Sequence, residues 1–116
     1  MNLQDLNFNK EFLGKKIIVT GASRGLGAEA CKVLADRGAE IAMLSRSKIE
    51  MENLRNRMQN SSKHISIKVD FLNNNSLNKA FKKAIDFLKK IDIIIHVAGG
   101  GFGLKEPLIK NDDLRS

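Results

Sequence analysis

The sequence contains no tyrosine and no tryptophan, and its six aromatic residues are all phenylalanine. It has one cysteine, so an internal disulfide is impossible and a disulfide-stapled secreted scaffold is excluded. No cluster of cysteine and histidine has the spacing of a zinc site. The longest apolar stretch, residues 91–104, is interrupted by Asp92, His96 and several glycines and is shorter than the ~20 residues of a spanning helix. We therefore predict a soluble, cytoplasmic protein without a metal site or a membrane partner.

With 116 residues the chain has the length of one domain, since domains commonly contain ~100 to 200 residues. Hydrophobic residues make up 42% and charged residues 28%, which is typical of a chain that folds. The net charge is +7. Such a charge can indicate nucleic-acid binding, but many lysines fall on the outer face of one predicted helix, and there is no base-stacking aromatic cluster. We predict no nucleic-acid partner.

Short β-branched runs alternate along the chain with segments of helical periodicity. The predicted strands are residues 15–20, 41–44, 64–69 and 91–98, and the predicted helices are residues 25–37, a segment from 47, and residues 77–90. The buried stripes expected on the three helices are, in order, Leu26, Ala30, Val33 and Leu34, then Met51, Leu54 and Met58, then Leu77, Phe81, Ala84, Ile85 and Leu88. This alternation predicts an α/β fold, a Rossmann-type parallel sheet with helices on both faces.

Capping residues mark the ends of these helices. Gly38 stands at the position of a left-handed C-cap after the first helix. Ser47, with Glu50 three residues later, forms a capping box that opens the second helix. Asn75 or Ser76 is expected to cap the third helix.

The sharpest signal is Thr-Gly-Ala-Ser-Arg-Gly-Leu-Gly at residues 20–27, between the first strand and the first helix. Gly21 lets the backbone turn off the strand, Gly25 leaves room for a pyrophosphate, and Gly27 allows the helix to pack close to the sheet. The free N–H groups of that helix would face the phosphates, and Ser23 can donate a further hydrogen bond. A purely structural glycine-rich turn is the alternative, and the flanking strand and helix favour a phosphate loop.

The spacing of these glycines resembles the Thr-Gly-x-x-x-Gly-x-Gly loop of the short-chain dehydrogenase/reductase family. The resemblance implies that the loop residues Arg24 and Leu26 also lie at the cofactor. Asp70, directly after the third predicted strand, stands where the family places a residue against the adenine, and Phe71 follows it.

A second motif carries the resemblance. Residues 91–100, Ile-Asp-Ile-Ile-Ile-His-Val-Ala-Gly-Gly, are similar to the family's fourth strand, which ends in Asn-Asn-Ala-Gly. His96 and Val97 replace the two asparagines, which brace the sheet and line the nicotinamide side of the cleft in the family. The small residues that would let the backbone approach the cofactor there are Ala98, Gly99 and Gly100. The family-like region is residues 15–114, after a leader of residues 1–14, and forms a single partial NADP-binding domain over residues 1–116.

The end of the second predicted strand indicates which dinucleotide would bind. An NAD-preferring site places an Asp or Glu about 20 residues past the glycines, on the ribose 2′-hydroxyl. Here residues 44–47 are Leu-Ser-Arg-Ser, without a carboxylate. Arg46 offers charge-assisted donors to a 2′-phosphate, Ser45 adds a hydroxyl, and Arg24 could reach the same phosphate. We predict NADP as the cofactor, with solvated surface arginines as the alternative.

The resemblance also implies an acid/base that this chain lacks. The family uses a Tyr, a Lys four residues later, a Ser and an Asn, all beyond the fourth strand, and this sequence has no Tyr. Asn111 precedes the helix to which the family's Asn belongs. In the expected strand order 3-2-1-4 the fourth strand would also be an unpaired apolar edge, and residues 112–116 end inside an element. We therefore predict no catalytic residue here and a fragment truncated after the fourth strand.

Taken together, the residues and the resemblance predict the nucleotide-binding half of an NADP-dependent oxidoreductase. It would transfer hydride to or from a small-molecule carbonyl or secondary alcohol, and the full-length protein would be a homo-oligomer. A non-catalytic dinucleotide-binding module and an inactive truncated fragment are the alternatives. His64 and His96 are given no catalytic role, and Cys31 is expected to be an inert core thiol.

Overall fold

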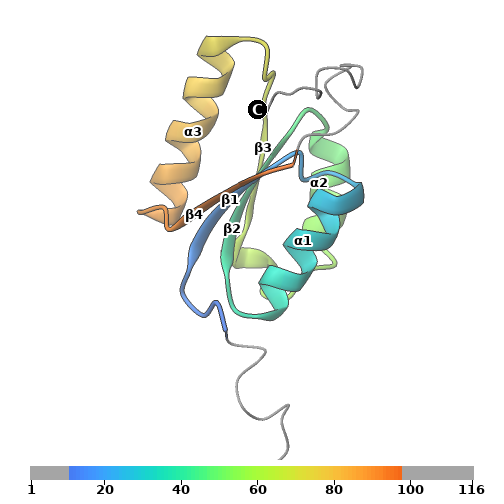
Figure 1. The fold of residues 1–116 in the computed structure, drawn as a ribbon. Coiled ribbons are helices and arrows are strands. Elements are labelled where there is room, and N and C mark those ends of the chain that lie inside the picture. Colours follow the sequence, from blue (N-terminus) through green and yellow to red (C-terminus); the bar gives the residue numbers. More distant parts are fainter. Residues whose placement is uncertain (1–10, 98–116) are drawn as a thin grey trace, which may run out of the picture.

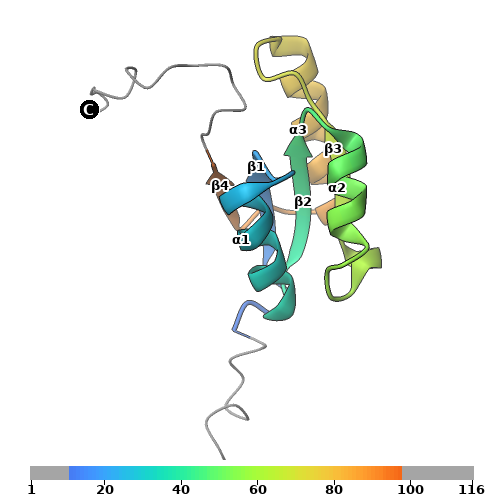
Figure 2. The ribbon, with the colours of Figure 1, turned by 90° about the vertical axis from the view of Figure 1, so that its right-hand side faces the viewer.

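Strands and helices alternate through residues 11–97, which the computed structural model describes. Their order is β1 (Lys16–Thr20), α1 (Gly25–Asp36), β2 (Glu40–Ser45), α2 (Lys48–Arg55), the 3-10 turn η3 (Ser61–Lys63), β3 (Ile65–Lys68), α3 (Asn74–Leu88) and β4 (Ile93–His96). Figure 1 shows α3 on one face of the sheet and α1 and α2 on the other, and Figure 2 shows the same layers after a quarter turn. No helix within these residues has both the length and the apolar character needed to cross a membrane.

The four strands are parallel and lie in the order β3-β2-β1-β4. This order confirms the Rossmann-type sheet that the sequence predicts. Thr20 of β1 is opposite Leu44 of β2 and His96 of β4, so the strands end almost level with one another. We call this side of the sheet, where β1 to β4 end, the carboxyl edge, and the side where they begin the amino edge. The strands in Figures 1 and 2 run upward, toward the carboxyl edge.

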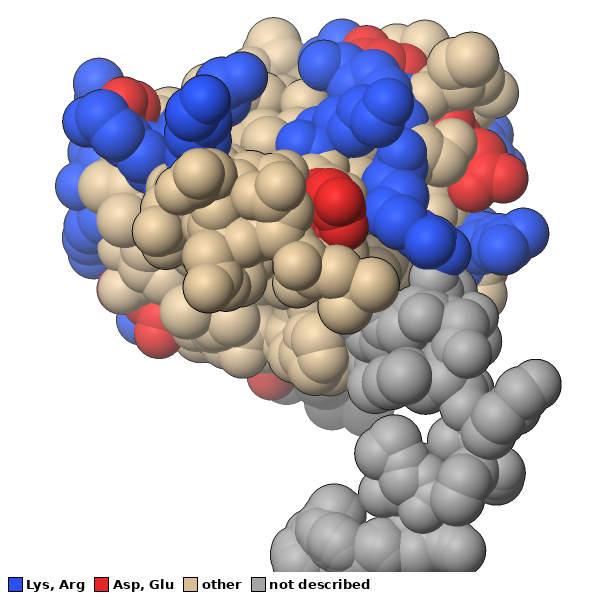
Figure 3. Space-filling model, turned by 90° about the horizontal axis from the view of Figure 1, so that it is seen from above, with Lys and Arg blue, Asp and Glu red and all other residues tan. Residues whose placement is uncertain are grey.

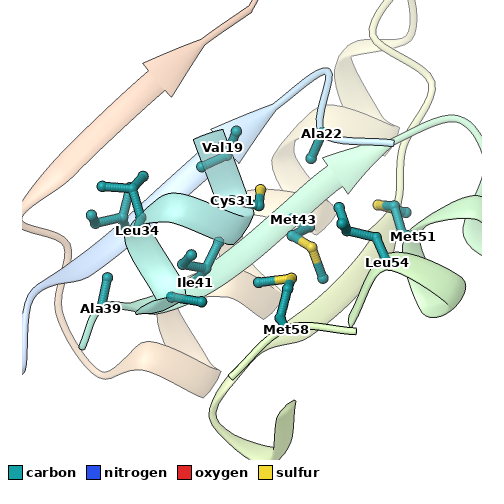
Figure 4. Packing of buried hydrophobic residues seen from close by; sticks show 12 residues of the cluster. Val19, Ala22, Cys31, Leu34, Ala39, Ile41, Met43, Met51, Leu54 and Met58 are labelled. Atoms are coloured by element: carbon teal, nitrogen blue, oxygen red, sulfur yellow. The ribbon is translucent and has the colours of Figure 1, made fainter. Parts of the chain in front are cut away.

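Both faces of the sheet are packed against helices. The cluster beneath α1 and α2, drawn in Figure 4, comprises Ile17, Val19, Ala22, Cys31, Leu34, Ala35, Ala39, Ile41, Met43, Met51, Leu54 and Met58. The cluster beneath α3 comprises Ile18, Ala42, Leu44, Ile67, Val69, Ala80, Ala84 and Leu88. Neighbouring residues of β1 and β2 therefore alternate between two cores, which explains why both strands are apolar along their whole length.

The buried stripe of α1 differs from the sequence prediction by one position. Leu26 is 74% exposed and Val33 is 45% exposed. The buried residues are Gly27, Cys31, Leu34 and Ala35. These four are spaced as one face of a helix, and this face includes Gly27, which packs against the backbone of the loop at Gly21 and Ala22.

The other two helices follow the predicted pattern more closely. Met51 and Leu54 are buried in α2 as expected. Met58 is also buried, but it lies after the end of α2 at Arg55, so its expected place on that helix was wrong. In α3 the fully buried residues are Ala80, Ala84 and Leu88, with Leu77 and Phe81 partly buried. Ile85 is 46% exposed, so its expected place in that stripe was wrong.

The caps explain where the helices begin and end. Ser47 opens α2, and its hydroxyl accepts a hydrogen bond from the Glu50 amide at 3.2 Å. The cap of α3 is Asn73, whose Oδ1 accepts from the Ser76 amide at 2.9 Å, so the expected cap at residue 75 or 76 was wrong. Gly38 follows α1 with a φ of +96°, which confirms the left-handed ending.

Candidate functional site

The chain leaves β1 through a tight turn at Gly21. Gly21 has a φ of +70°, a conformation that a residue with a Cβ rarely adopts. Its N–H donates to the carbonyl of Leu44 at 2.9 Å, and a Cβ at this position would collide with the carbonyl oxygen of Val97. The turn is therefore held between the end of β2 on one side and the residue after β4 on the other.

Two further glycines determine how α1 starts. A Cβ on Gly27 would collide with the carbonyl oxygen of Gly21, so only glycine lets the first turn of α1 lie against the loop. Gly25 has a φ of +62°, and the direction of its absent Cβ is open, with no atom within 4 Å. Gly27 thus serves close packing, whereas Gly25 leaves room at the N-terminus of α1.

The N-terminus of α1 also differs from those of α2 and α3. Its N-cap, Arg24, has an extended backbone and makes no side-chain capping hydrogen bond, whereas Ser47 and Asn73 cap their helices. The first N–H groups of a helix have no partner within it. In α1 these donors and the positive end of the helix dipole belong to the same first turn as Gly25, where the space is open. Ser23 is half-buried and Arg24 exposed beside this space.

The end of β2 forms a second polar corner at the carboxyl edge. Ser45 is 4% exposed, and its hydroxyl accepts a hydrogen bond from the Ser47 amide at 3.1 Å. That bond leaves the hydroxyl proton of Ser45 for donation to another acceptor. Arg46, between these two serines, is exposed. The corner therefore combines an exposed guanidinium with a hydroxyl whose position is fixed by a backbone bond.

Asp70 and Phe71 follow β3 at the same edge. Oδ1 of Asp70 accepts from the Leu72 amide at 3.0 Å, and the Asp70 amide donates to the hydroxyl of Ser76 at 2.8 Å. Asp70 is exposed, while Phe71 is partly buried against the core beneath α3. The loop after β3 is thus ordered by its own hydrogen bonds. Figure 3 shows this side of the molecule from above, with Lys and Arg side chains covering more of it than Asp and Glu.

The structure brings together most of the predicted cofactor-binding residues. The loop between β1 and α1, the corner after β2 and the loop after β3 all stand at the carboxyl edge, because parallel strands end on the same side. The predicted residues placed there are Gly21, Ser23, Arg24, Gly25, Leu26, Gly27, Ser45, Arg46, Asp70 and Phe71. Ala98, Gly99 and Gly100 lie outside the described residues.

Cys31 and His64 are two further titratable side chains, and both are buried. Burial raises the pKa of the Cys31 thiol to about 12, so this cysteine is protonated at neutral pH. His64 is buried near the amino edge, and burial lowers its pKa. Among residues 11–97 no three His, Cys, Asp or Glu side chains gather in a way that could hold a metal.

One contact of the carboxyl edge was missed by sequence reasoning. His96, which was given no catalytic role, has its ring nitrogen Nδ1 2.5 Å from the hydroxyl oxygen of Thr20. The two residues stand opposite each other in adjacent strands. A polar residue at the end of β4, level with the threonine that begins the glycine motif, was the only signal that could have revealed this pair.

The parallel sheet in the order β3-β2-β1-β4 with helices on both faces is a Rossmann-type fold, and comparison with known families narrows the class. The family model for short chain dehydrogenase matches residues 15–114, and the chain belongs to that family. It is 34% identical over 87 residues to the ketoacyl reductase HetN of Nostoc, covering 74% of this chain and 30% of that protein. It is 30% identical over 88 residues to the 3-oxoacyl-(acyl-carrier-protein) reductase FabG of Chlamydia pneumoniae, covering 75% of this chain and 36% of that protein.

A solved structure has a similar fold. The C-domain of a bacterial malonyl-CoA reductase, determined with NADP, matches 80% of this chain with a TM-score of 0.74 at 27% identity, over 16% of that longer chain. The chain spans 30% to 38% of the length of three curated relatives that it matches. Those relatives therefore contain much more protein than the part described here.

Proposed function

We propose that this chain is the NADP(H)-binding part of an oxidoreductase that transfers hydride to or from the carbonyl or secondary alcohol of a small-molecule substrate. One observation carries the proposal: α1 begins, without a side-chain cap, in a glycine turn that leaves open space at Gly25. Membership of the short chain dehydrogenase family supports it, as does the similarity to reductases and to a domain determined with NADP.

The residues of the carboxyl edge fit such a cofactor. The N–H groups that open α1 would bind the pyrophosphate, because a Cβ is absent where it must approach Gly25. Arg46 and Ser45 would bind a 2′-phosphate, with Arg24 on the other side of it. Asp70 would stand beside the adenine. When bound, NADPH supplies the hydride, and the role of these residues is to hold and orient it.

The proposal assigns no proton transfer to this chain. The residue type that the resemblance implies for that step, tyrosine, does not occur in the sequence. The predicted contacts of Ala98, Gly99 and Gly100 with the nicotinamide side, the homo-oligomeric state and the cytoplasmic location also remain predictions. The described residues are thus proposed to bind and orient the cofactor, and the substrate is proposed only by class.

The cofactor assignment is tested by reversing one charge. Arg46→Asp is expected to weaken NADPH binding at least about tenfold, ~1.4 kcal/mol, and to change NADH binding little, because only NADPH carries the 2′-phosphate. Titration calorimetry of the two nucleotides measures both constants. Lys83→Asp, on the exposed side of α3, makes the same charge change away from the site and serves as the control.

Two outcomes of this titration contradict the proposal in different ways. Equal losses for NADPH and NADH in Arg46→Asp would overturn the 2′-phosphate assignment and leave the phosphate loop in place. Absence of heat with either nucleotide in the unmodified chain would overturn the dinucleotide site itself.

A second function, dinucleotide binding without catalysis, is favoured by the absence of tyrosine from the sequence. It predicts that the full-length protein binds NADPH and leaves it unoxidised when a ketone substrate is added, whereas the first function requires the full-length protein to oxidise NADPH. Loss of NADPH absorbance above the rate of a Gly25→Ala control would contradict this second function.

A further inference from the structure

The last residues of β1 and β4 are joined by their side chains. Thr20 and His96 stand opposite each other in the parallel pair, and their Oγ1 and Nδ1 atoms are 2.5 Å apart. Thr20 is only 4% exposed, so its hydroxyl lies largely out of reach of water. A buried hydroxyl needs a hydrogen-bond partner inside the protein, and His96 provides it.

This pair lies immediately beside the glycine turn. Gly21 follows Thr20 in the chain, and the carbonyl of Val97, the residue after His96, occupies the place where a Cβ of Gly21 would be. The Val97 amide donates to the Thr20 carbonyl at 3.2 Å, so one backbone bond and one side-chain bond join the same two strand ends. On the other side, the Gly21 amide is bound to the carbonyl of Leu44.

We propose that His96 is a positioning residue for the phosphate loop, acting through the hydroxyl of Thr20. The Thr20–His96 hydrogen bond holds the end of β4 against the end of β1. It thereby keeps the carbonyl of Val97 in contact with the turn at Gly21. Without the bond, the two strand ends keep their backbone pairing, which includes the Val97 amide bound to the Thr20 carbonyl. The proposal relies on the proposed function for one point, that the loop binds the phosphates of NADPH.

Four variants and one control separate this role from a general effect on the fold. His96→Ala removes the ring, Thr20→Val removes the hydroxyl at nearly constant volume, and the double variant removes both. His96→Asn places an amide oxygen at the δ position and can restore the bond. Ile94→Ala is the control, since Ile94 is exposed on the same strand and points to the same face as His96.

The dissociation constant of NADPH is the first measurement. His96→Ala and Thr20→Val are each expected to weaken NADPH binding about fivefold. The double variant should bind no more weakly than the single variant with the larger loss, because both substitutions remove the same hydrogen bond. His96→Asn should recover most of the loss, and Ile94→Ala should bind like the unmodified chain. Multiplied effects in the double variant, or an equal loss in Ile94→Ala, would overturn the proposal.

The second measurement is made without nucleotide, so that it does not depend on the proposed function. Amide hydrogen exchange at Gly21 and Val97 should be faster in His96→Ala and Thr20→Val and normal in His96→Asn, and the ¹⁵N resonance of His96 Nδ1 should shift in Thr20→Val. Unchanged exchange and an unchanged resonance would overturn the positioning role. If the unmodified chain bound no NADPH, the proposed function would fail, while these measurements would still decide the role of His96.

Discussion

The two edges of the sheet use similar residues for different purposes. At the amino edge the polar groups bind one another. Nζ of Lys16 lies 2.5 Å from Oε1 of Glu40, and the Lys16 amide donates to Oδ2 of Asp92 at 2.8 Å. Lys90 adds an ion pair with Asp92 at 3.4 Å. These contacts join β1, β2 and the segment before β4 to one another.

His64 belongs to this first group. Its Nδ1 accepts a hydrogen bond from the Ile41 amide at 3.1 Å, and its Nε2 lies 2.7 Å from the carbonyl oxygen of Gln59. The pairing of β2 with β3 begins one residue later, at Ala42 and Ile65. The imidazole therefore satisfies a strand amide next to the start of the ladder, which is a structural use of a histidine.

At the carboxyl edge the helix α1 starts without a side-chain cap, and open space lies at Gly25. The difference follows from the topology, because in a parallel βαβ unit the helix N-terminus and its N–H donors come after the carboxyl end of the strand. Substitutions at the amino edge should therefore change stability alone, and those at the carboxyl edge should change nucleotide affinity.

The largest effect is expected for Gly27→Ala. Its Cβ would meet the carbonyl oxygen of Gly21, a backbone atom, so α1 must shift away from the loop. We expect the free energy of unfolding to fall by about 3 kcal/mol. Gly14→Ala is the control, because Gly14 has a φ of +77° and open space around it, so this substitution adds only backbone strain, about 1 kcal/mol. Equal losses in urea unfolding would show that the close approach at Gly27 is unimportant.

Gly25→Ala should affect affinity more than stability. Gly25 resembles Gly14 in having a positive φ and open space, so its cost in unfolding free energy should match that of Gly14→Ala. The new methyl group would project into the space proposed for the pyrophosphate, and NADPH binding should weaken on the order of a hundredfold, ~2.7 kcal/mol. Calorimetric titration of both variants measures this. Unchanged affinity in Gly25→Ala would mean that the pyrophosphate lies elsewhere.

Much of the fold and of the site could be predicted from the sequence. The strand order follows from the alternation of elements and from the resemblance. The glycine motif located the turn, because a Cβ on Gly21 or on Gly27 would collide with a backbone carbonyl oxygen. The stripe of α1 was misplaced because Gly27 and Cys31 contribute little to a hydrophobic pattern, although they define the buried face. A hydrophobic pattern that counts large side chains therefore does not predict the buried face of α1, because that face includes a glycine.

The hydrogen-bond partners of the two histidines could not be predicted either. His64 and His96 are separated by many residues from Ile41 and Thr20, the residues that they contact. Such contacts depend on the register between strands, which a single sequence does not specify. The cap of α3 was missed for a local reason, since three consecutive asparagines offered several candidates and the chain uses Asn73.

The amino edge should respond to pH through His64. Burial lowers the pKa of this histidine below its ordinary value of 6.5, so near and below that value the unfolded chain binds more protons than the folded one. The contribution of neutral His64 to the free energy of unfolding is complete above pH 6.5 and is lost as the pH falls below that value. The free energy of unfolding then decreases by at most ~1.4 kcal/mol per pH unit through this group. Urea unfolding at about pH 7.5 and about pH 5.5 should show a larger decrease for the unmodified chain than for His64→Gln.

The smallest effect is expected for Glu40→Gln, and it tests the division between the edges most directly. Glu40 pairs with Lys16 and lies 4.0 Å from Lys63, with all three side chains partly exposed. Partly exposed ion pairs contribute little, so the free energy of unfolding should fall by ~0.2 to 1 kcal/mol, and by less at high salt. The NADPH dissociation constant should stay within about twofold of the unmodified value, ~0.4 kcal/mol. A tenfold loss of affinity would mean that the amino-edge contacts are transmitted along β1 to the glycine turn, and the separation of stability from binding would then be wrong.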